Sequence, residues 1–101
     1  EILAGRGLRI YRYVMQIVWE EPKRRANFAK HGLDFGALTE DFFSNALTRP
    51  AKSGRFQAIG KDRNGIISVV FAVLGVEGIS VVSMRSASKE ERKAYNDFTK
   101  K

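Results

Sequence analysis

The sequence predicts an α+β protein in which two helices precede an antiparallel meander of three or four strands and a last helix closes the chain. Three observations predict this fold class. Helix-starting and helix-ending residues gather in the first 45 positions, apolar runs separated by turn residues follow, and a helix-capping pattern comes last. Because the helical signals are separate from the strand signals, the pattern favours α+β over alternating α/β.

The length and composition fit one folded domain with a basic surface. The 101 residues are too few for two packed cores, and 44% of them are hydrophobic. Eighteen Lys and Arg against eleven Asp and Glu give a formal net charge of +7, which favours a polyanionic partner. The chain has no cysteine and one histidine, which excludes disulfides and thiolate metal sites. We therefore expect no metal and no other cofactor.

The segment Glu1–Val14 is interpreted as an extension preceding the domain, or as residues added to it. Met15 followed by Gln-Ile-Val-Trp looks like a natural start, so the single domain spans 15–101. A loose alternation of apolar residues within the first segment leaves an extra strand as the alternative. No apolar run in the chain is long enough to form a membrane helix, so we expect no membrane association.

A short strand and a first helix open the predicted domain. The strand covers Gln16–Trp19, and the helix covers Lys23–Lys30. Pro22 lies where the helix begins, a position that tolerates proline. Gly32 is placed to end the helix in a left-handed conformation.

A second helix is predicted over Phe35–Phe43. Asp34 can cap its N-terminus, and Phe35, Leu38 and Phe42 fall on one helical face. The stretch Asn45–Gly54, which contains a proline and a glycine, is predicted to mix a short strand with loop.

Three strands follow, joined by tight turns. Arg55–Lys61 alternates as a strand, and the dipeptide Asn64-Gly65 predicts a two-residue hairpin whose turn positions need positive φ. Ile66–Val73 is almost wholly apolar, which favours a central strand covered on both faces. Ile79–Arg85 is the last strand.

A capping box starts the final helix. Ser88 is followed three residues later by Glu91, the spacing at which each side chain bonds the other's backbone. Tyr95 and Phe98 are expected on the buried side of this helix.

One face of the first helix carries Lys23, Asn27, Lys30 and His31. The functional interpretation is a stripe that faces phosphate, with His31 able to change its charge near neutral pH. The alternative is a solvated helix face.

Two arginines end strands. Arg55 opens one strand, and Arg85 closes another in phase with Ile79, Val81 and Ser83. A charged side chain at the end of an apolar face has to reach the rim of the sheet or a cleft, where a guanidinium suits phosphate. The alternative for Arg85 is an ion pair with Glu90 or Glu91.

If the partner is RNA, these side chains could cleave it without a metal ion. His31, Lys30 or Tyr95 could transfer the protons. Arg55 and Arg85 could stabilise the charge that develops on the phosphorane. Lys23, Lys52 and Arg92 are assigned to RNA binding.

Two spaced motifs resemble the signatures of one family. The first motif comprises Trp19–Lys23, Asn27 and Lys30–Phe35, and the second comprises Ser83–Ser88, Glu91-Arg92 and Tyr95. Together they resemble the BrnT family of bacterial toxins, except that Glu20 stands where that family usually has Asp.

The resemblance implies a compact RelE-like fold and an endoribonuclease toxin of a type II toxin–antitoxin pair that halts translation in the bacterial cytoplasm. It implies a BrnA-like antitoxin with a ribbon-helix-helix region, a hetero-oligomer with that antitoxin, and contact with operator DNA only through it. The matched positions Lys30, His31, Arg85 and Tyr95 are the catalytic candidates, to which the strand interpretation adds Arg55.

Two further positions of the motifs are assigned to structure. Trp19 is expected in the core, and Asn27 is expected to bond a loop. The competing function is a non-catalytic basic module that binds nucleic acid or protein, for example a corepressor that acts with its antitoxin and spares RNA.

Overall fold

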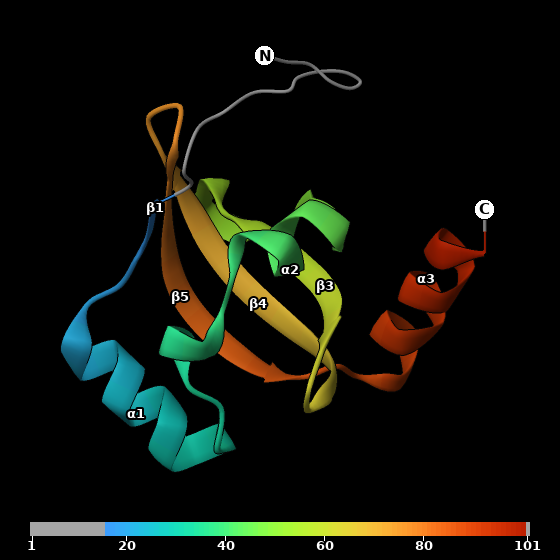
Figure 1. Cartoon of the computed structure of the whole chain (residues 1–101), viewed down its shortest axis with the longest axis horizontal. Helices are drawn as coiled ribbons and strands as arrows, with labels where there is room; N and C mark the ends of the chain where they lie inside the picture. Colours follow the sequence, from blue (N-terminus) through green and yellow to red (C-terminus); the bar gives the residue numbers. More distant parts are fainter. Residues whose placement is uncertain (1–15, 101) are drawn as a thin grey trace.

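The computed structural model describes residues 16–100. The predicted extension Glu1–Val14, including its alternative as an extra strand, lies outside the described residues. In chain order the elements, with η for 3-10 turns, are β1 (Gln16–Val18), α1 (Glu21–His31), η1 (Phe35–Ala37), α2 (Glu40–Asn45), β2 (Leu47–Pro50), η2 (Lys52–Gly54), β3 (Phe56–Asp62), β4 (Gly65–Leu74), β5 (Gly78–Ser86) and α3 (Lys89–Thr99) (Figure 1).

The strands form a single sheet in the order β1-β5-β4-β3-β2. Strands β2 to β5 are an antiparallel meander, and β1 joins its far edge parallel to β5. The predicted α+β class, the meander and the C-terminal helix are therefore confirmed. Within residues 16–100, no helix is long and apolar enough to cross a membrane.

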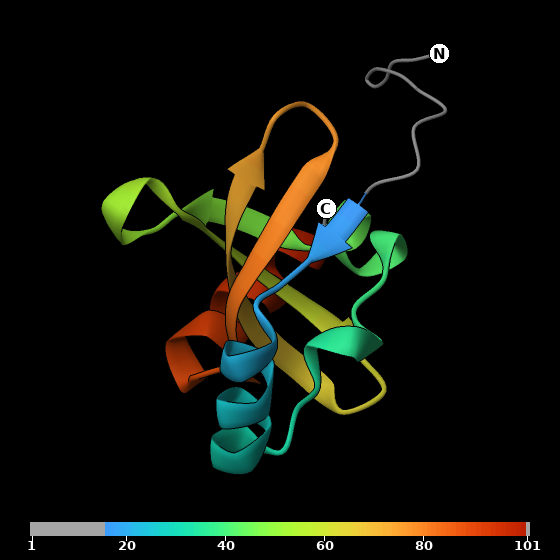
Figure 2. The ribbon, with the colours of Figure 1, turned by 90° about the vertical axis from the view of Figure 1, so that its left-hand side faces the viewer.

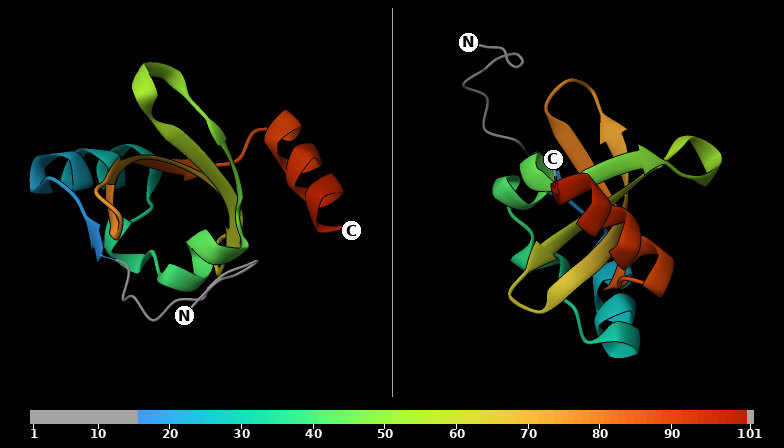
Figure 3. Two further views of the ribbon diagram at one scale, coloured as in Figure 1. Left: turned by 90° about the horizontal axis from the view of Figure 1, so that it is seen from above. Right: turned by 90° about the vertical axis from the view of Figure 1, so that its right-hand side faces the viewer.

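The sheet is strongly curved, and its two faces carry different chemistry. Seen from above, it wraps around the segment that contains η1 and α2, while α3 lies outside the curve (Figure 3). The concave face holds the main core, which includes Phe35, Phe43, Val69, Phe71 and Met84. The convex face, beneath α3, is where the polar side chains described below gather.

The predicted helix over Phe35–Phe43 is wrong in its continuity. Its periodic residues are buried, but the backbone is extended at Leu38 and Thr39 and divides the segment into η1 and α2. Asp34 caps η1 by accepting from the Gly36 N–H at 2.9 Å, as a capping residue does. Thr39 caps α2 in the same way, with its hydroxyl accepting from the Phe42 N–H at 3.1 Å. Because both residues act as helix caps, the apolar residues of this segment are divided between two short helices.

Asn27 joins α1 to the free edge of β5. Strand β1 covers β5 only from Gly78 to Ser80, so the edge of β5 beyond that point needs another partner. The Asn27 amide supplies it: Nδ2 donates to the Met84 carbonyl at 2.8 Å, and Oδ1 accepts from the Met84 N–H at 3.1 Å. Nδ2 also donates to the Leu33 carbonyl at 3.3 Å, which confirms the predicted bond to a loop. One buried side chain thus bonds the two backbone groups of Met84 that a neighbouring strand would otherwise bond.

The hairpin at Asn64-Gly65 is present, but its turn lies one residue earlier than predicted. Asp62 pairs with Gly65, so Arg63 and Asn64 are the turn residues. Of these positions only Gly65 has positive φ, at 105°. Gly65 is therefore the first residue of β4, a position whose positive φ favours glycine, whereas the two turn residues do not have positive φ.

The predicted capping box of α3 is confirmed, whereas the predicted burial of its apolar side is correct only in part. Ser88 Oγ accepts from the Glu91 N–H, and the Glu91 carboxylate accepts from the Ser88 N–H. Tyr95 is half-buried, but Phe98 is 41% exposed because the distal part of the helix extends away from the sheet (Figure 1).

Candidate active site

A β-bulge places Arg85 on the convex face of the sheet. Val70 pairs with Ser83 but Phe71 pairs with Val81, so β5 has one extra residue between the two pairs. The bulge reverses the alternation, and the buried core residue after it is Met84. The prediction that Arg85 is in phase with Val81 is therefore wrong. Its side chain lies on the face opposite the core, next to Ser68 on β4.

Arg85 is held by Glu91 in a two-point ion pair. Nη1 donates to Glu91 Oε1 at 2.8 Å and Nη2 donates to Oε2 at 2.9 Å, while Nη1 also donates to the Ser86 carbonyl at 3.1 Å. The ion pair that the sequence left as the alternative is therefore present. It does not use the whole guanidinium, since within residues 16–100 no partner is found for Nε. The Arg85 side chain is 42% exposed, so this edge remains open to a ligand.

Glu91 is the centre of the cluster. Its carboxylate accepts from Arg85, from the Ser88 N–H and from Gln57 Nε2 at 2.8 Å, and its side chain is only 9% exposed. Gln57 Nε2 also donates to Ser68 Oγ at 2.9 Å, which fixes the orientation of the amide. A carboxylate with this many donors is satisfied where it lies, and it positions Arg85 rather than competing for it.

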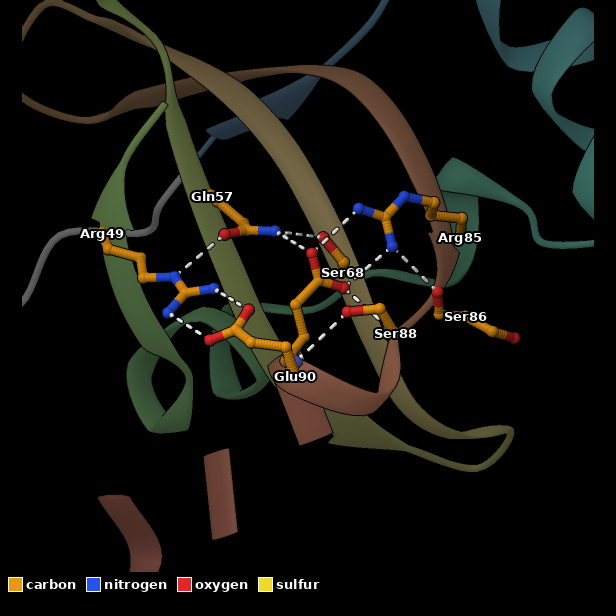
Figure 4. A network of polar contacts seen from close by, with 8 residues as sticks. Arg49, Gln57, Ser68, Arg85, Ser86, Ser88 and Glu90 are labelled. Atoms are coloured by element: carbon orange, nitrogen blue, oxygen red, sulfur yellow. Dashed lines mark hydrogen bonds and ion pairs between the residues drawn. The ribbon is translucent and has the colours of Figure 1, made fainter. Parts of the chain in front are cut away.

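Arg49 on β2 extends the network across the sheet (Figure 4). Its Nε donates to Gln57 Oε1 at 3.1 Å, and its Nη2 lies 3.0 Å from Glu90 Oε1. The network therefore runs from Arg49 through Gln57 and Glu91 to Arg85, and it draws on β2, β3, β5 and α3. Sequence analysis did not single out Arg49. The only signal for it was an arginine in a stretch of unclear secondary structure.

The donors around Glu91 change its titration. The Arg85 guanidinium, opposed by burial and helped by the Ser88 N–H and Gln57, lowers the pKa of Glu91 from 4.5 to about 2. At a separate site, Arg24 and the Gly36 N–H lower the pKa of Asp34 from 3.8 to about 2. Both groups therefore stabilise the folded state above their ordinary pKa, and this contribution is lost as the pH falls toward 2.

We therefore expect Glu91→Gln to lower the free energy of unfolding most at neutral pH. The deficit relative to the parent chain should be up to about 3 kcal/mol at pH 7 and should shrink between roughly pH 5 and pH 2, where the parent protonates Glu91. Urea denaturation at a series of pH values measures this difference. Glu77→Gln, which removes an exposed carboxylate from the β4–β5 turn, is the matched control. A deficit that does not change with pH would contradict the role assigned to the Glu91 charge.

The structure separates Arg55 from Arg85. Strands β3 and β5 run in the same direction, and Arg55 precedes the start of one whereas Arg85 lies near the end of the other. Ile59, in the same row as Arg85, lies four residues beyond Arg55, which is about 13 Å along the strand. Arg55 is exposed on the β2–β3 hairpin, together with Lys52 in η2, and this hairpin projects from the body (Figure 2).

Lys30 and His31 lie exposed at the end of α1, with Lys23 about two turns earlier. Asn27 fixes the rotation of this helix by facing β5, and Arg24 bonds Asp34 on the side of the η1 segment. At 100° per residue, His31 projects on the Arg24 side, whereas Lys23 and Lys30 project on the other side, toward the convex face. Asn27, the buried member of the predicted stripe, therefore separates His31 from Lys23 and Lys30.

Tyr95 lines a separate groove of about 480 Å³ between α2, α3 and the β3–β4 turn, with Lys61 and Arg63. Arg92 is exposed on α3. Within the described part of the chain, no hydrogen bond or ion pair joins Lys30, His31, Arg55 or Tyr95 to the Arg85 cluster. In the same residues, no group of three or more His, Asp or Glu side chains is arranged to hold a metal ion.

Comparison with known proteins identifies the family of this chain. Residues 19–91 match the family described as the ribonuclease toxin, BrnT, of type II toxin–antitoxin systems. The chain belongs to the BrnT family. Among solved structures it is similar to the ribonuclease toxin BrnT of Brucella abortus, with 51% sequence identity over 74% of this chain and 99% of that chain, and a TM-score of 0.69. No curated protein sequence matches the chain.

Membership of the BrnT family confirms the resemblance found in the two motifs. It establishes a ribonuclease toxin of a type II system, which implies an RNA target and an antitoxin partner. The BrnT match ends at Glu91, so it includes the whole Arg49–Arg85 network but not Arg92 or Tyr95. The expected structural role of Trp19, where the match begins, also holds: it is half-buried and packs edge-on against Phe35 with ring centroids 6.4 Å apart.

Proposed function

We propose that this chain cleaves RNA without a metal ion and that Arg85 contacts the scissile phosphate. The observation that carries the proposal is the state of Arg85: Glu91 and Ser86 hold the guanidinium in one orientation while its Nε edge has no partner in residues 16–100. A guanidinium fixed in this way can donate two parallel hydrogen bonds to phosphate oxygens through Nε and the second Nη2 proton.

The chemistry needs two proton transfers and one centre of positive charge. The 2′-hydroxyl oxygen attacks phosphorus and gives its proton to a base, the P–O5′ bond breaks, and the leaving O5′ takes a proton from an acid. Arg85 stabilises the charge on the phosphorane, as preorganised donors do. Lys30, which projects toward the convex face, is the proposed source of proton transfer beside Arg85. His31 projects on the opposite side of α1 and Tyr95 lines a separate groove, so neither is assigned to this phosphate.

Four further basic residues are proposed to hold the rest of the RNA. Arg55 and Lys52 project on the β2–β3 hairpin, away from Arg85, so we assign Arg55 to binding of flanking RNA rather than to the phosphorane. Lys23 and Arg92 are exposed and suit backbone phosphates. The net charge of +7 supports this electrostatic component.

The biological setting is part of the same proposal. It comprises a fold of the RelE kind, inhibition of translation in the bacterial cytoplasm, and neutralisation by a BrnA-like ribbon-helix-helix antitoxin in a hetero-oligomer that alone contacts operator DNA. Family membership and the basic composition support it.

The decisive experiment incubates purified protein with a single-stranded RNA in excess EDTA. We expect fragments with 2′,3′-cyclic phosphate ends, and no cleavage of an RNA whose 2′-hydroxyls are methylated. Cleavage that requires added Mg²⁺ would reject the metal-independent mechanism. Binding that is weakened by salt and never followed by cleavage would favour the non-catalytic module instead.

A further inference from the structure

The two arginines of the network have different carboxylate partners. Glu91, which holds Arg85, has a side chain that is 9% exposed and accepts from four donors. Glu90, which holds Arg49, is 70% exposed. An exposed ion pair contributes little to stability, so Glu90 can leave Arg49 at small cost, whereas Glu91 cannot leave Arg85.

The Arg49 guanidinium is nevertheless held in one orientation by its neighbours. Its Nε donates to Gln57 Oε1, and the Gln57 amide is fixed by its own bonds to Ser68 and Glu91. The two Nη atoms then face outward as a fork, with Glu90 Oε1 and Oε2 at 3.0 and 3.4 Å. Carboxylate and phosphate oxygens both fit this fork, so the Glu90 carboxylate stands where phosphate oxygens would bind.

Arg49 cannot share the phosphate of Arg85. Gln57 and Glu91 lie between the two guanidiniums and bond them from both sides, so no single phosphate can bridge them without breaking the network. An RNA that engages both arginines would therefore need a separate phosphate for each, and one strand that crosses the convex face from β5 to β2 would supply both.

We propose that Arg49 binds a second phosphate of the RNA strand and that Glu90 occupies this subsite until RNA displaces it. The proposal rests on the proposed function only in naming RNA as the ligand of the convex face. It makes Glu90 a competitor within the same chain, so removing its charge should strengthen RNA binding while removing Arg49 should weaken it.

The test measures binding of a fully 2′-O-methylated oligoribonucleotide, which is not cleaved, by fluorescence anisotropy. We expect Arg49→Gln to weaken binding by about tenfold and to reduce the dependence of log K on log salt by about one. We expect Glu90→Gln to strengthen binding several-fold, and to do so only when Arg49 is present. Arg49→Lys, which keeps the charge but not the fork, should recover only part of the loss.

The controls make the same charge changes elsewhere. Arg63→Gln removes a positive charge at the β3–β4 turn, and Glu77→Gln removes a negative charge at the β4–β5 turn. The proposal is overturned if Glu90→Gln has no larger effect than Glu77→Gln, if Arg49→Gln has no larger effect than Arg63→Gln, or if the effect of Glu90→Gln persists without Arg49.

A cleavage assay separates this proposal from the proposed function. If Arg85→Ala still cleaves normal RNA at the parent rate while the Arg49 and Glu90 effects on binding hold, the subsite stands and the catalytic assignment fails. If Arg85→Ala abolishes cleavage but Arg49→Gln binds RNA as the parent does, the catalytic assignment stands and the subsite fails.

Discussion

Replacing Arg85 with alanine should lower the rate of RNA cleavage by about 10²- to 10³-fold. This is the loss expected when one preorganised donor to a developing negative charge is removed. The substitution also leaves the buried Glu91 without its main partner, so some stability should be lost as well. Single-turnover cleavage of a labelled RNA by folded protein measures the catalytic effect.

Two controls separate the catalytic role of Arg85 from its structural role. Circular dichroism and a thermal melt establish that Arg85→Ala is folded at the assay temperature. Arg63→Ala, which removes an exposed arginine from the β3–β4 turn, tests the general effect of charge. If folded Arg85→Ala cleaves RNA as fast as Arg63→Ala, Arg85 does not act on the scissile phosphate.

Replacing Asn27 with alanine should lower the free energy of unfolding by about 3 kcal/mol. The Met84 N–H and carbonyl would both lose their partner at a buried edge of β5, and each unsatisfied buried group costs about 1–3 kcal/mol. Urea denaturation at pH 7 measures the change.

Asn45→Ala is the matched control for Asn27. Asn45 is exposed, and its amide bonds only the Asp41 carbonyl within its own helix, so the loss should stay within roughly 0.5 kcal/mol. Equal losses in the two variants would show that the Asn27 amide does not act as the missing strand of the sheet.

Signals that act over a few residues were sufficient to predict several elements. Gly32 ends α1 with φ of 72°, and Ser88 starts α3 with the predicted capping box. Both depend on hydrogen bonds between residues no more than four apart, so the residue types at these positions are sufficient to predict them. The second helix is predicted as continuous because its apolar residues keep a helical period, and periodicity alone does not show that Asp34 and Thr39 both act as caps and divide it.

The site itself depends on pairing between distant strands. A single extra residue in β5 moves Arg85 to the convex face, and nothing in an alternating pattern shows where such a bulge falls. The pairing of β2 with β3 decides on which face of the sheet Arg49 lies, because it brings Arg49 beside Gln57. For the same reason Arg55, which looked equivalent in the sequence, lies at the other end of the sheet.

Composition, local hydrogen bonding and spacing are sufficient to predict the α+β class, the order of elements, the basic character and the BrnT motifs. Which arginines share a face, and which carboxylates hold them, depends on how distant parts of the chain pack together. Those contacts join residues up to 41 positions apart, and their geometry depends on strand register and on one bulge.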